Sequence, residues 1–263
     1  IRDRLIIMRL NPPIITVFYF ILACILFAES TTTRIEFTAD QGYSDGPLHS
    51  NINWLAPDRN VWTVDSLTGI LTITNQNKWA RALYNVPNLN LNTNKYTCTE
   101  TFSISFKKGS SAVVSNGALP LGIIALCNKD KNPEFIGACI RQIKSNRFNF
   151  GIIAKLNGKN DNRFSRSFDG TLLGLSIDES GNWLDTDSDQ LRFEFTLKYN
   201  GDQWVQVLSL KNITTESSIE TITHVLKDDD NSFVKSDQAL LLGSSNLRGN
   251  DIAFKISTIT LKN

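Results

Sequence analysis

The sequence predicts an all-β protein, an antiparallel two-sheet β-sandwich of jelly-roll type. Apolar and polar residues alternate with a period of two in many short segments, which is the pattern of half-buried strands. Clusters of Asn, Gly, Asp and Ser, the residues that favour turns, separate these segments. No long segment carries the apolar stripe of a helix. Many short strands joined by polar turns are typical of sandwiches.

The clearest strand is expected at 191–199, where alternation is strict through all nine residues. Asn200-Gly201 follows and predicts a type I′ hairpin turn to a return strand at 204–210. The parity of the apolar positions slips between Ile256 and Ile259, which predicts a β-bulge in the last strand. The other expected strands are 34–38, 61–65, 70–74, 80–84, 97–106, 119–128, 135–143, 147–156, 172–178, 219–226, 238–243 and 252–261.

The first thirty residues have the pattern of a secretory signal peptide. A basic start containing Met8 leads into an apolar run over 14–28, and small residues then predict cleavage after Ser30 or Ala28. Residues 1–7 would then be an upstream translation artefact. Two alternatives stay open: a membrane anchor, for which the run is short, and a lipoprotein carrying its lipid on Cys24.

Charge and composition exclude several function classes for the remainder, residues 31–263, which we expect to form one domain. The chain has 27 Lys and Arg against 26 Asp and Glu, a balance that argues against a nucleic-acid binder. Two His leave little room for a His-rich metal centre or several catalytic imidazoles. We therefore expect an exported protein, extracellular or periplasmic, with no membrane span after processing.

Three cysteines follow the leader. Cys127 and Cys139 lie on consecutive expected strands, so a disulfide across the hairpin is a candidate. Buried thiols are the equally ordinary alternative in such apolar strands. Cys98 shares a strand face with Glu100 and Phe102, so this carboxyl is expected to be partly buried.

Several short motifs resemble those of secreted bacterial concanavalin A-like lectin/glucanase domains. They are the opening Phe37–Leu48, the segments 62–65, 69–71 and 79–82, the stretch 189–197 and the final strand 252–261. The resemblance covers roughly residues 34–263. It implies two stacked antiparallel sheets with a concave outer face, where family members often hold a glycan. Members include hydrolases, lectins, carbohydrate-binding modules and adhesin parts, so the fold alone does not choose among them.

The residues favour binding over catalysis. Glycoside hydrolysis needs two carboxyl groups on either side of one bond. Enzymes of the resembled superfamily place two Glu in a Glu-x-Asp-x-Glu or Glu-x-Asp-x-x-Glu motif, and neither occurs in this chain. Two acids distant in sequence could still meet in space.

Two groups of residues are the candidates for a ligand or metal site. Trp54 and Trp183 occur in polar, Asn- and Asp-rich segments, where an indole is a candidate sugar platform, and Trp79 with Arg81 matches the resembled motif. Asp185, Asp187 and Asp189 alternate along the chain and offer oxygen ligands suited to Ca²⁺. The complete EF-hand motif is not present, and a solvated loop is the alternative interpretation.

The sequence thus predicts an exported, non-catalytic domain whose partner is a carbohydrate or cell-surface glycan. Two alternatives remain: a polysaccharide-degrading enzyme with an atypical acid pair, and a structural or adhesive component of the cell envelope. No cofactor other than Ca²⁺ is expected.

Overall fold

The fold is known from a computed structural model that describes most of the chain after Thr31. The described residues are 32–51, 53–57, 61–74, 80–85, 95–106, 108–109, 120–128, 134–144, 146–156, 158–184, 190–226, 238–244 and 252–262. They belong to one compact unit, Thr32–Asn263. The leader, Cys24, Trp79 and Asp185, Asp187 and Asp189 lie outside the described residues, so the predictions made for them stay predictions.

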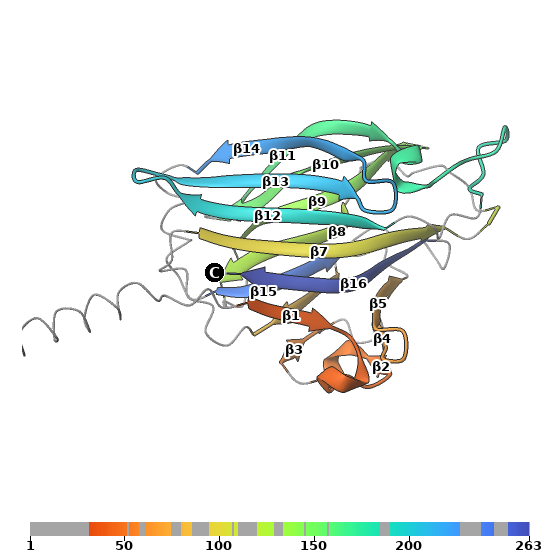
Figure 1. Cartoon of the computed structure of the whole chain (residues 1–263), viewed down its shortest axis with the longest axis horizontal. Coiled ribbons are helices and arrows are strands. Elements are labelled where there is room, and N and C mark those ends of the chain that lie inside the picture. Colours follow the sequence, from red (N-terminus) through yellow and green to blue (C-terminus); the bar gives the residue numbers. More distant parts are fainter. Residues whose placement is uncertain are drawn as a thin grey trace, which may run out of the picture. The chain divides into compact units, whose positions relative to one another are not determined.

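Two antiparallel sheets form the sandwich (Figure 1). The first has nine strands in the order β14-β13-β12-β7-β16-β5-β4-β2, with β1 also paired to β16. Its strands are β1 (Thr32–Glu36), β2 (Gly46–Pro47), β4 (Trp62–Asp65), β5 (Ile70–Thr74), β7 (Lys95–Phe106), β12 (Leu191–Tyr199), β13 (Trp204–Asn212), β14 (Ser218–Val225) and β16 (Ile252–Lys262).

The second sheet lies behind the first in Figure 1 and has seven strands in the order β11-β10-β9-β8-β15-β6-β3. Its strands are β3 (Trp54–Leu55), β6 (Ala80–Tyr84), β8 (Pro120–Asn128), β9 (Phe135–Lys144), β10 (Arg147–Leu156), β11 (Lys159–Asp169) and β15 (Gln238–Ser244). The predicted antiparallel two-sheet sandwich is therefore confirmed.

Inward-facing residues of both sheets fill the core. The aromatic ring of Phe102 stacks between those of Phe193, at 5.0 Å, and Phe254, at 4.7 Å. Residues of β7 that point the other way are polar, and one of them, Thr97, contacts Thr196 of β12 through hydroxyl groups 3.1 Å apart. The alternation read from the sequence is thus the division between the core and the outer face of the nine-stranded sheet.

One expected strand is absent, and three strands were not predicted: β11 and the two-residue strands β2 and β3. The chain forms a 3₁₀ helix, Gly170–Leu173, that includes the first two residues of 172–178. Its first turn is capped because the Asp169 carboxylate accepts the Thr171 amide. Leu173 is buried in this turn, and Leu175, whose amide donates to the Gly170 carbonyl, is buried just after it; neither belongs to a ladder. Strand β11 was missed because an edge strand this polar shows no apolar alternation. The other two 3₁₀ helices are Ala39–Gln41 and Leu48–Ser50.

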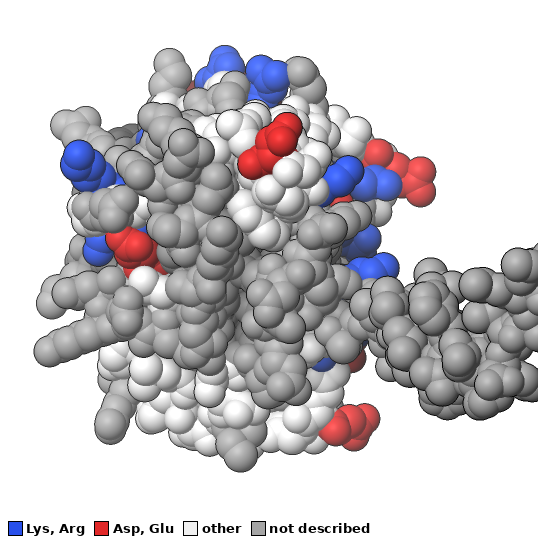
Figure 2. All heavy atoms as spheres, turned by 90° about the vertical axis from the view of Figure 1, so that its left-hand side faces the viewer, with Lys and Arg blue, Asp and Glu red and all other residues white. Residues whose placement is uncertain are grey.

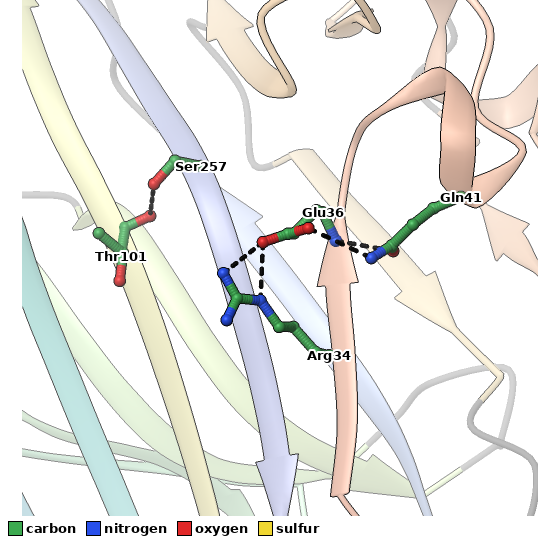
Figure 3. Close-up of polar contacts among 5 residues, drawn as sticks. All are labelled: Arg34, Glu36, Gln41, Thr101 and Ser257. Atoms are coloured by element: carbon green, nitrogen blue, oxygen red, sulfur yellow. Dashed lines mark hydrogen bonds and ion pairs between the residues drawn. The ribbon is translucent and has the colours of Figure 1, made fainter.

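The predicted bulge in β16 is confirmed. The register between β16 and β7 shifts between Ile256 and Thr258, and the hydroxyl of the extra residue, Ser257, donates a hydrogen bond of 3.2 Å to the Thr101 carbonyl (Figure 3). On the neighbouring strand β1, Glu36 forms an ion pair with Arg34, and its amide donates to the Gln41 side chain.

The turn after β12 differs from the predicted type I′ hairpin. Tyr199 pairs with Trp204, so the loop has four residues, and Gly201 alone among them has a positive φ, of 108°. The Asn200 carboxamide oxygen accepts the amides of Asp202 and Gln203. This side-chain turn gives the backbone an alternative to the two-residue loop, since Asn readily bonds to amides two residues ahead.

The candidate disulfide is not formed: Cys127 and Cys139 are free, buried thiols, as is Cys98. In the β8–β9 register Cys127 lies opposite Phe135 and Cys139 opposite Ile123. The two cysteines share a sheet face but are offset by four residues, roughly 13 Å along the strand. A disulfide needs Cα atoms about 4.4–6.8 Å apart, so this register excludes the bond.

A second apolar layer covers the outer face of the seven-stranded sheet. Its members alternate with inward core residues along β8, β9, β10 and β15, and each is at most 8% exposed. We call it the outer apolar layer, and it consists of Ile123, Ala125, Cys127, Phe135, Cys139, Ile153, Ala239 and Leu241. The free cysteines at 127 and 139 are therefore ordinary apolar members of a packed layer.

Candidate functional site

An open pocket of about 420 Å³ lies at the edge of the seven-stranded sheet, where β3 pairs with β6 and β15 runs beside them. The described residues that line it are Asn53, Trp54, Leu55, Leu83, Asn85 and Ala239. This volume lies in the range of small-molecule sites. None of these lining residues carries a charge, and amides, an indole and aliphatic groups share the surface.

The short pairing of β3 with β6 places both asparagines at the pocket. Trp54 lies opposite Tyr84 and Leu55 opposite Leu83, and the Asn85 amide donates to the Asn53 carbonyl at 3.1 Å. Asn53 adopts φ of 70°, a left-handed conformation that Asn tolerates better than most residues. The pairing of β3 with β6 therefore brings together at the pocket two amide side chains that are 32 positions apart in the sequence.

Trp54 forms a fixed wall of the pocket and not a loop platform. Its side chain is only 6% exposed, and its Nε1 donates a 2.9 Å hydrogen bond to the hydroxyl of Tyr43. Its ring lies 4.9 Å from that of Tyr84 and 6.2 Å from that of Phe37. Only a margin of the indole is thus available to a ligand.

Two tyrosines beside Trp54 are partly withdrawn from water. Burial raises the pKa of Tyr43 to about 12, although the hydrogen bond from Trp54 acts in the opposite direction. Burial likewise raises the pKa of Tyr84, and a hydrogen bond with the Asn53 side chain opposes that shift. Both hydroxyls are therefore neutral at physiological pH, and Tyr84 also orients one of the pocket's amides.

The apolar side of the pocket continues into the outer apolar layer. Ala239 belongs to that layer and Leu83 packs against it. Leu55 on β3 is 64% exposed and forms part of the lining. A single exposed leucine is ordinary, but one beside a pocket with polar groups is a contact available to a bound molecule.

Two other predicted site residues, Trp183 and Arg81, do not line this pocket. Trp183 is 1% exposed, and its ring stacks on Phe106 at a centroid distance of 3.9 Å, so no ring face is open to a ligand. Arg81 lies on β6 opposite Gly243, on the same face as Leu83 two residues further on, and it does not line the pocket. Trp79 falls outside the described residues.

A metal centre is not apparent in the part of the chain that the structure describes, which holds no group of three His, Cys, Asp or Glu suited to an ion. Asp185, Asp187 and Asp189 lie outside that part, so the Ca²⁺ prediction for them is untested. Asp178, just upstream, is a turn residue, since its carboxylate accepts the amides of Ser180 and Asn182. These backbone bonds lower the pKa of Asp178.

Charge is distributed without a dominant sign. On the face seen in Figure 2, basic and acidic side chains of the described residues are interspersed, in keeping with a formal net charge of +1 for the whole chain. Within the described residues no helix is both long and apolar enough to cross a membrane.

Comparison with known proteins identifies the architecture. No family model matches the chain, and no curated protein sequence does. Among solved structures, basic winged bean lectin with Tn-antigen superposes with a TM-score of 0.53 at 10% identity, covering 89% of this chain and 98% of that one. The fold is that of the concanavalin A-like lectins.

Two further structures agree with this assignment of the fold. Lectin I from Ulex europaeus, in complex with the methyl glycoside of α-L-fucose, gives a TM-score of 0.53 at 12% identity over 89% of this chain and 98% of that chain. Peanut lectin with a nine-residue peptide gives 0.51 at 13% identity, over 89% and 97%. The concanavalin A-like jelly roll expected from the sequence motifs is thus confirmed, as a fold.

Sequence reasoning found Trp54 but missed the rest of the pocket. Asn53, Leu55, Leu83, Asn85 and Ala239 belong to no motif, and they meet only because β3, β6 and β15 are neighbours in one sheet. The one local signal is the asparagine before Trp54, a residue type that accepts a left-handed turn.

Proposed function

We propose that this domain binds carbohydrate, without catalysis, in the pocket between β3, β6 and β15. The observation that carries the proposal is the composition of the lining within the described residues: two asparagine amides beside an indole edge and three aliphatic side chains, with no charged group among them. Such a surface offers both hydrogen bonds and apolar contact to one small molecule.

The chemistry of each group fits a sugar ring. A carboxamide both donates and accepts hydrogen bonds, so Asn53 and Asn85 can satisfy hydroxyl groups in either role. The C–H face of a pyranose is apolar and can lie against Leu55 or Leu83. At physiological pH an amide has no proton to transfer, so the pocket favours binding over the two-carboxyl hydrolysis of a glycosidic bond.

The fold adds support of a general kind. Two of the similar structures contain a sugar ligand, Tn-antigen in winged bean lectin and the methyl glycoside of α-L-fucose in the Ulex lectin. Their identity to this chain is 12% or less, so the specificity proposed for this pocket rests on its own residues.

A glycan array with the purified domain, followed by titration calorimetry on the best ligand, tests the proposal. Leu55→Ala and Asn85→Ala should each weaken binding roughly tenfold or more, the equivalent of about 1.4 kcal/mol. Leu67→Ala is the matched control for Leu55→Ala, because Leu67 is 91% exposed on the β4–β5 turn and does not line the pocket.

Two results would overturn the proposal. One is that the folded protein binds no glycan on a broad panel. The other is sugar binding that Leu55→Ala and Asn85→Ala leave unchanged, which would place the ligand elsewhere on the domain.

We also propose that the protein is exported and meets its glycan outside the cell. The support is the signal-peptide pattern of residues 1–30. Mass spectrometry of the protein from its native host should give a chain beginning just after Ser30 or Ala28. Recovery of an unprocessed chain in the cytoplasm would reject export.

A further inference from the structure

Glu100 is a carboxyl group inside the apolar core. It lies on β7, a central strand of the nine-stranded sheet, directly opposite Phe193 of β12 and Ile259 of β16. The residue is 1% exposed, and its neighbours on the same strand face, Cys98 and Phe102, are equally buried. The backbone register therefore holds this side chain between the two sheets.

No hydrogen-bond partner compensates this burial. Neither Oε1 nor Oε2 of Glu100 forms a hydrogen bond with any group within the described part of the chain. The titratable and charged residues at inward positions of the elements around it are Tyr96 and Cys98 on β7, His224 on the edge strand β14, Tyr84 on β6 and Arg166 on the edge strand β11. The residues opposite Glu100 on β12 and β16 are apolar. The described core of β8 and β9 in the facing sheet is also apolar, apart from the uncharged Gln142 on β9.

An ionised carboxylate without partners is expensive to keep in such surroundings, whereas a protonated carboxyl is tolerated. Burial accordingly raises the pKa of Glu100 to about 8, from an ordinary value of 4.5. Below pH 4.5 both the folded and the unfolded chain carry the proton. Between pH 4.5 and about 8 only the folded chain retains it, so raising the pH favours unfolding.

We propose that Glu100 makes the core a pH-sensitive lock, closed while this carboxyl holds its proton and loosened as the proton is lost. The domain is then most stable in a mildly acidic medium. Between pH 4.5 and about 8, each increase of one pH unit multiplies the unfolding equilibrium constant by up to ~10, because unfolding releases the proton of Glu100.

The test is denaturant unfolding of the domain at a series of pH values from 4.5 to about 8. For the wild type, the logarithm of the unfolding constant should rise with pH with a slope approaching one. Glu100→Gln and Glu100→Met should abolish most of this slope, since neither side chain ionises. Glu194→Gln is the matched control, because Glu194 lies on β12 with its side chain exposed, and it should keep the wild-type slope.

The proposal would be overturned if the unfolding constant of both Glu100 variants kept the wild-type dependence on pH, or if that of the wild type did not depend on pH. If neither variant folds, carbon-13 NMR of the wild type labelled at its glutamate carboxyl groups decides the question. One resonance should titrate near pH 8. A spectrum in which no glutamate resonance titrates near pH 8 would refute the proposal.

Discussion

The indole nitrogen of Trp54 donates a 2.9 Å hydrogen bond to the hydroxyl of Tyr43. Trp54 belongs to β3 of the seven-stranded sheet, whereas Tyr43 lies between β1 and β2 of the nine-stranded sheet. The bond therefore ties the two sheets together at the wall of the candidate pocket, in a cluster with Phe37 and Tyr84.

Tyr43→Phe should destabilise the domain by about 1–3 kcal/mol, because it leaves the buried Trp54 N–H without its acceptor. Urea denaturation measures the change. Tyr199→Phe is the control, since Tyr199 is 36% exposed and packs on Trp204 through its ring, and it should change stability by less than about 0.5 kcal/mol. Equal effects of the two substitutions would contradict this role of the Trp54–Tyr43 bond.

The bulge in β16 should depend on a hydroxyl group. Ser257→Ala removes the hydrogen bond to the Thr101 carbonyl and should cost about 1 kcal/mol in unfolding free energy (Figure 3). Ser209→Ala, on the outer face of β13, is the comparison and should be nearly neutral. A neutral Ser257→Ala would mean that backbone pairing alone fixes the bulge.

Asn212-Ile213-Thr214 is a sequon for N-glycosylation in a eukaryotic secretory host. We nevertheless expect Asn212 to be a structural residue. It is 3% exposed, its side-chain oxygen accepts the amides of Thr214 and Thr215, and its side-chain nitrogen donates to the Leu172 carbonyl. Asn212→Ala should therefore lower the unfolding free energy by at least about 2 kcal/mol in thermal or urea denaturation. Thr214→Ser keeps the hydroxyl that accepts the Gln190 amide, and stability close to the wild type is expected.

The cysteines should behave as buried thiols. A thiol reagent should label Cys98, Cys127 and Cys139 only after denaturation, since all three are at most 1% exposed. Burial raises the pKa of Cys98 and Cys139 above the ordinary thiol value, which further slows reaction because the thiolate is the nucleophile. A reductant should leave the melting temperature unchanged. A mass deficit of two hydrogens in the native protein would instead reveal a disulfide.

How much of the structure could be predicted depended on whether a feature is local. The strand Leu191–Tyr199 agreed with its expected bounds, because a period of two records which side chains face the core. The bulge at Ser257 was predicted for the same reason, as a slip in that period. The strand expected at 172–178 is not formed. Buried leucines near a capped 3₁₀ turn give the same short apolar pattern in the sequence as a buried strand.

The candidate site was less accessible from sequence. Trp54 is a candidate from the sequence because an indole in a polar segment has no packing partner nearby in the sequence. In the structure its partners are Tyr43, Phe37 and Tyr84, which come from other segments. Trp183 was chosen on the same argument and proved to be core, stacked on Phe106. Packing partners that come from distant strands leave no trace in the neighbouring sequence.

The sequence by itself determined the fold class, most strand positions and the inward direction of Glu100, because alternation is a property of a single strand. Only the tertiary structure decided that Cys127 and Cys139 stay apart, since that follows from the β8–β9 register. It alone joined Asn53 and Asn85 with Leu83 and Ala239 in one pocket. The physical reason is that register and strand order arise from packing the two sheets together, which no single segment encodes.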